Sequence, residues 1–196
     1  MSIEGMEWGV LKMESNLKAS KTTKDMILIS LAAILIAICS WISLPLTVPV
    51  TLQTFAVFTV AGLLGLKRGT FAVILYILLG TIGLPVFSGF TGGVGILFGN
   101  TGGYIVGFIF SALVTGLIIK YFGRKKAVLV ISMIAGMLIC YLFGTAWFIN
   151  VYTRNTGAVG ILTALSWCVF PFIIPDAVKI GLAVIVVDRV YKYVQH

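Results

Sequence analysis

Six apolar segments most constrain how this chain can fold. They run approximately over residues 26–44, 52–66, 70–83, 102–119, 127–148 and 175–190. A helix needs about 20 residues to cross about 30 Å of hydrocarbon, so 196 residues hold six or seven crossings and short connections. With 60% apolar and 10% charged residues, the chain lies outside the range of soluble domains. The segments predict an all-α integral membrane protein with six transmembrane helices, and they exclude a soluble enzyme or a nucleic-acid-binding protein.

The basic residues predict the orientation of this protein. With a cytoplasmic N-terminus, twelve of the 14 Lys and Arg residues fall in cytoplasmic segments. The outer loops then hold only Arg154, and Lys179 lies inside the last span. Because Lys and Arg gather on the cytoplasmic side of membrane proteins, we predict that both termini are cytoplasmic. Residues 1–25 form a cytoplasmic N-terminal segment in this prediction, and residues 26–196 form a single six-helix membrane domain.

A further apolar stretch, residues 161–174, raises the alternative of seven crossings. That topology would place the C-terminal Arg189 and Lys192 outside, against the charge bias. We therefore predict that residues 161–171 form an interfacial or re-entrant helix, broken by Pro171 and Pro175.

Two of the predicted spans are too short to cross the bilayer as helices. The segment over residues 70–83 has 14 residues, which cover about 21 Å at 1.5 Å per residue. The segment over residues 52–66 is similarly short and follows a stretch broken by Pro45 and Pro49. Non-helical backbone at membrane depth is tolerated where protein buries it or where it lines a cavity. The short spans predict a ligand pocket toward the extracellular side.

Asp176 and Lys179 are the only charged residues in the interior of a predicted span, since Asp188 and Arg189 lie at the cytoplasmic end of the sixth. Their i,i+3 spacing places both on one helix face, near the outer end of the sixth span. Such charges are costly in a membrane and indicate a functional site by default. A self-satisfying structural ion pair is the alternative, although apolar residues would replace such a pair at little loss. We predict that Asp176 and Lys179 bind a ligand.

A glycine-rich stretch, residues 83–103, is the second candidate. Its glycines free the backbone to approach a ligand closely, and Phe87, Phe90 and Phe98 are aromatic residues suited to pocket walls. No Lys or Arg occurs between Arg68 and Lys120, so the stretch is not a phosphate-binding P-loop. A flexible extracellular loop is the alternative.

Thr51, Gln53 and Thr54 supply neutral donors and acceptors at the start of the second span, close to the same outer face. Helix capping is an equally good interpretation of these residues. Cys39, Cys140 and Cys168 each lie in an apolar run and are interpreted as small buried side chains. The only histidine is the last residue, His196, so we expect no catalytic site, no metal site and no cofactor.

Small residues at four-residue spacing allow close contact between helices. They occur as Ala33 and Ala37 on the first span and as Gly103 and Gly107 on the fourth. Such pairs usually pack a protein's own bundle, and the alternative is contact with a partner subunit.

Four motifs together resemble the BioY family, the biotin-binding S components of energy-coupling-factor (ECF) vitamin importers. The motifs are PVTLQTF at residues 49–55, GLPVF at residues 83–87, GNTGGY at residues 99–104 and FIIPDAVK at residues 172–179. The resemblance covers about residues 26–190. It implies a six-helix S component in the bacterial plasma membrane that captures biotin outside the cell. It also implies partners for ATP-driven uptake, namely one membrane coupling subunit and two ATP-binding-cassette ATPases.

The resemblance also suggests roles for particular residues. Asp176 and Lys179 would pair with the polar ends of biotin, with Lys179 favouring the carboxylate. Asn100, Gln53 and Thr51 would supply neutral hydrogen bonds, and Phe87, Phe90 and Tyr104 would clasp the rings. Ala33 and Ala37 look like the small-residue patch that such S components present to the coupling subunit. Biotin is here the transported ligand and not a cofactor.

Three other functions fit parts of the sequence. An S component for a different small vitamin would share the architecture and the outer pocket. A membrane enzyme would use Asp176 and Lys179 as acid and base, but the interiors of the spans contain no second carboxylate, no histidine and no metal-ligand cluster. A structural subunit without a ligand would leave the intramembrane charges unexplained.

Overall fold

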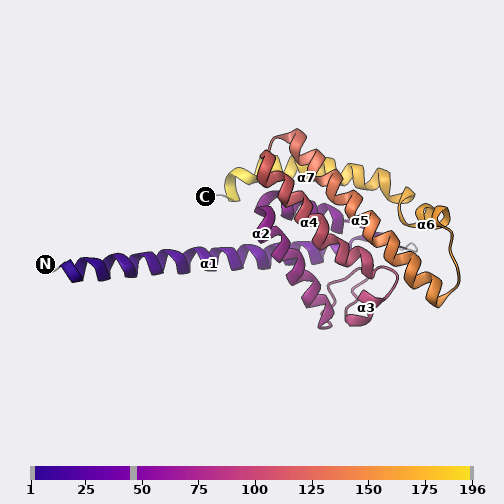
Figure 1. Ribbon diagram of the computed structural model, residues 1–196, viewed down its shortest axis with the longest axis horizontal. Helices are drawn as coiled ribbons and strands as arrows, with labels where there is room; N and C mark the ends of the chain where they lie inside the picture. The colour runs from indigo at the N-terminus through magenta and orange to yellow at the C-terminus, as the bar shows by residue number, and fades with distance from the viewer. Residues whose placement is uncertain (1–2, 45–47, 195–196) are drawn as a thin grey trace.

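The computed structural model describes residues 3–44 and 48–194, and most of them are helical. The helices are α1 (Ile3–Trp41), α2 (Gln53–Thr81), α3 (Val94–Phe98), α4 (Gly102–Phe122), α5 (Lys126–Asn155), α6 (Ile161–Cys168) and α7 (Phe170–Val194). Two short antiparallel strands, β1 (Ser43–Leu44) and β2 (Val50–Thr51), lie between α1 and α2. Helices α2, α4, α5 and α7 form a bundle, and α1 packs against it and extends far beyond it (Figure 1). The predicted all-α class is therefore confirmed apart from the strand pair.

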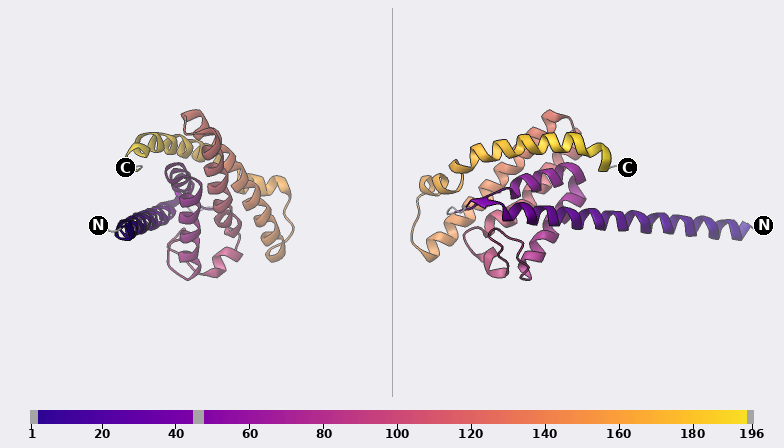
Figure 2. Two further views of the ribbon diagram at one scale, coloured as in Figure 1. Left: turned by 60° about the vertical axis from the view of Figure 1, so that its left-hand side comes forward. Right: turned by 180° about the vertical axis from the view of Figure 1, so that it is seen from behind.

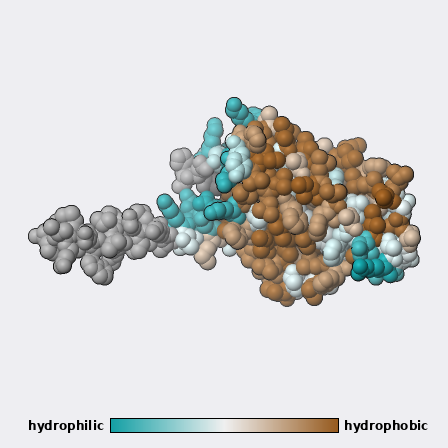
Figure 3. Space-filling view, in the orientation of Figure 1, coloured by the Kyte–Doolittle hydropathy of each residue, from teal (hydrophilic) through white to brown (hydrophobic). Residues whose placement is uncertain are grey.

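Five helical segments among the described residues are long and apolar enough to cross a membrane, one fewer than the sequence predicts. They are Lys21–Trp41, Gln53–Thr81, Gly102–Phe122, Lys126–Asn155 and Ile161–Tyr193. The difference arises in α2, which contains both the second and the third predicted span. An apolar belt covers the body of the molecule, and hydrophilic residues gather at its two ends (Figure 3). The described ends of α1 and α7 lie toward the same end (Figures 1 and 2).

Helix α2 folds back on itself at Gly65. The backbone there has φ 75° and ψ −170°, a left-handed conformation that glycine adopts without steric cost. A Cβ atom on Gly69 would lie 2.9 Å from the Cα atom of Ala61, whereas residues eight apart in a straight helix are about 12 Å apart. Residues 53–64 and 66–81 are thus two arms lying side by side, about 18 Å and 24 Å long at 1.5 Å per residue.

Arg124, in the connection between α4 and α5, caps the first arm at this elbow. Its guanidinium donates to the carbonyl oxygens of Gly62 and Leu63, which the break leaves without helical partners. It also lies 3.9 Å from the ring centroid of Tyr191 on α7. Burial lowers the pKa of the guanidinium, which nevertheless stays charged at neutral pH because its ordinary pKa is above 12. One cation thus joins three segments that are distant in sequence.

Replacing Arg124 with glutamine should destabilise this elbow. Because hydrogen bonds from a charged donor contribute about 1.5–3 kcal/mol each, we expect the apparent Tm in detergent to fall by several degrees. The matched control is Lys125→Gln, since Lys125 is exposed and its loss should leave the Tm within about a degree. Equal Tm values for the two variants would contradict the capping role of Arg124.

The last apolar region divides near the predicted place, but not at the predicted residue. Residues 161–168 form the separate helix α6, as expected, and the break falls at Val169 (φ −127°, ψ −56°). Helix α7 then begins at Phe170 and contains Pro175 in its interior. The prediction that Pro171 and Pro175 break the helix is therefore wrong, because both lie within α7. Pro171 lies in the first turn, where its missing N–H has no helical partner, and Pro175 removes only the bond to the carbonyl of Pro171. The early start adds more than a turn to the predicted span.

Glycines bring α4 and α5 into close contact. A Cβ atom on Gly103 would collide with the side chain of Trp147, and one on Gly107 would lie 3.3 Å from Cys140 Sγ. In the other direction, Gly144 of α5 faces the ring of Tyr104. The predicted role of the Gly103 and Gly107 pair in helix contact is confirmed. The same packing places Tyr104 of α4 beside Cys140 of α5.

Candidate functional site

A cavity of about 180 Å³ lies between the helices, and residues from α2, α4, α5 and α7 line it. A single water molecule needs a cavity volume of only about 10–15 Å³. The cavity is therefore large enough for a small organic molecule. Its apolar walls include Phe87, Phe108 and Phe172, and its polar lining includes Thr51, Gln53, Thr54, Tyr141, Asp176 and Lys179. A mostly apolar pocket with a few polar groups is typical of a small-molecule site.

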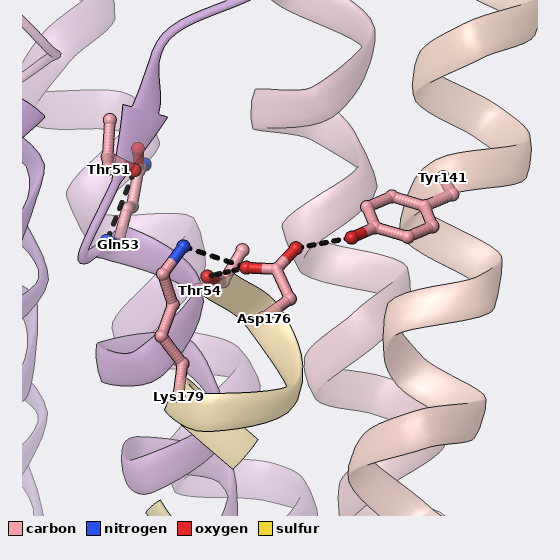
Figure 4. Close-up of polar contacts among 6 residues, drawn as sticks. All are labelled: Thr51, Gln53, Thr54, Tyr141, Asp176 and Lys179. Atoms are coloured by element: carbon pink, nitrogen blue, oxygen red, sulfur yellow. Dashed lines mark hydrogen bonds and ion pairs between the residues drawn. The ribbon is translucent and has the colours of Figure 1, made fainter. Parts of the chain in front are cut away.

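Asp176 and Lys179 lie together in this cavity and are 1% and 5% exposed. Lys179 Nζ lies 2.7 Å from Asp176 Oδ1. The same oxygen accepts a hydrogen bond of 3.0 Å from the Thr54 hydroxyl, and Oδ2 accepts one from the hydroxyl of Tyr141 on α5 (Figure 4). Three donors from three helices thus surround one carboxylate, which offsets the cost of burying its charge.

Lys179 has capacity beyond its contact with Asp176. An ammonium group has three N–H donors, and one of them is used by Asp176. Among the described residues, Lys179 has no other protein partner, and it lines the cavity. The carboxylate already accepts three hydrogen bonds from the protein, whereas the ammonium keeps two unused N–H donors. An anion entering the cavity would therefore bind Lys179 rather than Asp176.

Thr51 ends β2, Gln53 begins the first arm of α2, and both line the cavity. The Thr51 hydroxyl accepts a hydrogen bond of 3.2 Å from the Gln53 backbone N–H (Figure 4). The side-chain amide of Gln53 donates to the hydroxyl of Tyr76 in the second arm at 2.8 Å. Capping and pocket lining are therefore not exclusive at Thr51, because its hydroxyl supports the helix start while its side chain borders the cavity.

Aromatic residues form two parts of the wall. Phe87 is 2% exposed and meets the ring of Tyr76 edge to face, with 5.6 Å between ring centroids. Tyr104, on α4, shares a hydrogen bond of 2.9 Å with the hydroxyl of Thr145. Gly80 faces Phe87 so closely that any side chain there would overlap the ring. The rings are thus held in fixed positions before a ligand binds.

The glycine-rich stretch over residues 83–101 closes one side of the cavity and is ordered by contacts at both ends. The indole N–H of Trp41 donates to the Pro85 carbonyl at 2.8 Å, and that of Trp147 donates to the Gly99 carbonyl at 3.0 Å. Between them Phe87 and Thr91 pair as an antiparallel bridge. These contacts argue against the alternative of a flexible loop.

Six of the eight predicted ligand residues line the cavity, namely Asp176, Lys179, Gln53, Thr51, Phe87 and Tyr104. Phe90 and Asn100 are not among the lining residues. Phe90 is 64% exposed and stacks on Trp41, with 4.9 Å between ring centroids. The stretch turns at Phe90 with φ 57°, and this turn carries the ring outward. Phe98, also predicted as a wall residue, is 69% exposed.

Ala33 and Ala37, predicted to contact a partner subunit, are buried in this chain. They are 1% and 6% exposed and belong to its own hydrophobic core. Their burial favours the alternative in which the pair packs α1 against the bundle. Cys39, Cys140 and Cys168 are free and buried, as predicted, and the latter two also line the cavity.

Tyr76, Tyr141 and the role of Thr54 as a partner of Asp176 are missing from the sequence prediction. A signal was present for the two tyrosines, since a phenol hydroxyl in the middle of an apolar span needs a partner. Nothing in the spacing of residues indicates that Tyr141 reaches Asp176, 35 positions away.

The fold and this site together define a polytopic helical membrane protein with an internal pocket for a small molecule. Comparison with known proteins specifies the class further. The family model described as "BioY family" matches residues 13–196. This chain therefore belongs to the BioY family, whose members are transport proteins of the cell membrane and not enzymes. The resemblance seen in the four motifs is thereby confirmed.

Individual relatives agree with this assignment. The chain is 42% identical over 161 residues to the biotin transporter BioY of Thermotoga maritima, covering 81% of this chain and 90% of that protein. It is 37% identical over 167 residues to the probable biotin transporter BioY of Pyrococcus horikoshii, covering 85% and 95%. A crystal structure of the S-component for biotin from an ECF-type ABC transporter superposes with a TM-score of 0.79 at 26% identity, covering 88% of this chain and 93% of that chain.

Proposed function

We propose that this chain is a biotin-binding S component, which captures biotin outside the cell and delivers it for ATP-driven uptake by an ECF module. The names of its relatives supply the ligand and the transporter class. The observation that carries the proposal is the cavity itself, which combines one unsaturated buried cation, neutral amide and hydroxyl groups and aromatic walls. Apart from this cation, Lys179, and its partner Asp176, no charged residue lines the cavity in the part of the chain that the structure describes.

Biotin has three chemical parts, and each has a counterpart in the cavity. Its carboxylate pairs with Lys179, which keeps unused N–H donors. Its ureido ring, both donor and acceptor, is met by Gln53 and Thr51. Its apolar thiophane ring packs between Phe87 and Tyr104. Asp176 holds Lys179 in place and is a positioning residue in this proposal, while contacts of Asn100 and Phe90 with the ligand stay predictions without geometric support.

The topology belongs to the same proposal. The elbow at Gly65 divides α2 into two crossings, which gives six in total, and both termini face the cytoplasm because the basic residues gather at that end. The cavity then opens toward the extracellular side. Residues 1–25 form a cytoplasmic segment, and residues 26–196 form the membrane domain.

A module of one coupling subunit and two ATP-binding-cassette ATPases supplies the energy in this proposal, since the chain has no GxxxxGK[ST] sequence for binding ATP phosphates. The contact surface for that module is not assigned to Ala33 and Ala37, because both side chains are buried.

Isothermal titration of the purified protein with a panel of vitamins tests the ligand. We expect biotin to bind, and we expect vitamins without a ureido ring to produce no measurable heat of binding. Desthiobiotin, which keeps the ureido ring and the carboxylate, should bind more weakly than biotin because it lacks the thiophane ring. Tighter binding of another vitamin would favour the alternative of an S component with a different substrate.

Removing the Tyr141 hydroxyl tests whether this group supports Asp176. In Tyr141→Phe the carboxylate loses one of three donors, and we expect biotin affinity to fall about tenfold, because hydrogen bonds to charged groups contribute about 1.5–3 kcal/mol. Tyr152→Phe, the same change on the same helix but away from the cavity lining, is the matched control. Unchanged affinity in Tyr141→Phe would show that the hydroxyl does not support the site.

A further inference from the structure

A second hollow lies on the outside of the bundle, along α5. It has a volume of about 570 Å³, and its lining consists of one face of α5 and Phe98 at the end of α3. The α5 residues include Phe143, Trp147, Asn150 and Arg154. Their spacings of three and four positions place them in a single row along the helix. This α5 groove shares no lining residue with the internal cavity.

The polar end of the α5 groove carries a cation and two amides without protein partners. Arg154, Asn150 and Asn155 line this end and are exposed. In the described part of the chain, none of the three side chains makes a hydrogen bond or an ion pair with the protein. Figure 3 shows a hydrophilic patch at this end of the apolar belt, where α5 finishes.

Among the residues whose side chains the structure describes, no carboxylate neutralises Arg154. The chain has 6 acidic residues. Asp25, Asp188 and Asp176 pair with Arg68, Lys126 and Lys179. The other three precede residue 20, in the part of α1 that projects from the opposite end of the molecule (Figure 1). The guanidinium is therefore an uncompensated cation with five N–H donors, suited to bidentate contact with a phosphate.

The other end of the α5 groove is apolar. Phe143 lies eleven residues before Arg154, which is about 16 Å along the helix, and Phe98 forms the side wall. The hydrogen bond from Trp147 to Gly99 fixes that wall against α5. A free anion would need only the polar end, whereas a cation at the membrane boundary with an apolar trough leading inward matches a phosphate joined to an acyl chain.

We propose that the α5 groove binds one phospholipid with an anionic headgroup. Arg154 contacts its phosphate, Asn150 and Asn155 donate to the headgroup oxygens, and an acyl chain lies along Phe143 against Phe98. An exposed asparagine within a membrane helix is costly without a polar partner, and the headgroup supplies that partner to Asn150. The bound lipid is distinct from the transported ligand.

Native mass spectrometry of the purified full-length chain tests this site. The protein is delipidated in detergent and titrated with phosphatidylglycerol or with phosphatidylcholine of identical acyl chains. We expect one phosphatidylglycerol to be retained, with about tenfold lower affinity in Arg154→Gln because a charge-assisted contact is lost. Phosphatidylcholine should bind more weakly than phosphatidylglycerol to the unaltered protein. Equal retention of the two lipids would contradict the proposal that the groove prefers an anionic headgroup.

Arg189→Gln is the matched control, since it removes the same charge from an exposed position at the other end of the protein. Equal loss of phosphatidylglycerol in both variants would indicate a general charge effect and would overturn the site, as would unchanged retention in Arg154→Gln. Because Arg154 does not line the internal cavity, the variant should keep its Tm and its biotin affinity. Displacement of the lipid by saturating biotin would also overturn the proposal, since it would show that the groove takes the transported ligand.

Discussion

Replacing Lys179 with methionine should reduce biotin affinity by about 100-fold or more. Two effects combine in this variant: the ligand carboxylate loses its cation, and Asp176 becomes a buried charge without an ionic partner. Removing one member of a buried, hydrogen-bonded charge pair typically costs 2–5 kcal/mol or more, and about 2.7 kcal/mol corresponds to 100-fold. Titration calorimetry with biotin measures the affinity, and thermal unfolding in detergent measures whether the fold survives.

Two further variants separate ligand contact from folding. Lys192→Met makes the same change at an exposed position and should leave affinity unchanged. The double variant Asp176→Asn, Lys179→Met removes both buried charges, so its Tm should recover above that of the single variant while biotin binding stays lost. Recovery of binding together with the Tm would mean that Lys179 acts only through folding and does not contact biotin.

The sequence predicts Asp176 and Lys179 because two charges are conspicuous in an apolar span and because i,i+3 spacing on a helix determines their geometry. It does not predict Tyr141 or Tyr76, because a tyrosine fits an apolar helix pattern and its hydroxyl partner lies on another helix. Partners that are distant in sequence depend on helix packing, which the local pattern does not specify.

Phe90 and Asn100 illustrate a second reason why the predicted site differs from the cavity in the structure. In a helix the spacing of residues determines which side chains share a face, but a glycine-rich stretch has no such period. Whether an aromatic residue there points inward, as Phe87 does, or outward, as Phe90 does, depends on individual turns. The elbow in α2 is a similar case, since charged residues 67 and 68 mark the boundary between two predicted spans but do not show that helix geometry resumes directly after Gly65.

Gly116→Ala should lower the free energy of unfolding by about 1–3 kcal/mol, the usual cost of overpacking. A Cβ atom on Gly116 of α4 would lie 2.6 Å from the Cα atom of Leu66, which immediately follows the break in α2. The neighbouring atom is backbone at a tight elbow, so it has little freedom to move away. Thermal unfolding in detergent, monitored by circular dichroism, measures the change.

Gly181→Ala is the matched control for this prediction. Gly181 lies within α7, and a Cβ atom there meets nothing within 4 Å. The change should therefore raise the free energy of unfolding by about 0.5–1 kcal/mol, because alanine loses less conformational freedom than glycine in a helix. If both variants shift the Tm in the same direction, the close approach of α4 to the elbow does not limit stability.

The pairing of Asp176 with Lys179 has an electrical consequence for uptake. The empty cavity is neutral, since one anion and one cation are its only charged lining residues in the described chain. Biotin bound as a carboxylate gives the loaded cavity a charge of about −1, because the carboxyl group is ionised at neutral pH. Moving one such charge inward against an inside-negative membrane potential costs about 2.3 kcal/mol per 100 mV. In the proposed transport cycle, the membrane voltage therefore opposes delivery, and ATP hydrolysis by the partner module must supply that work.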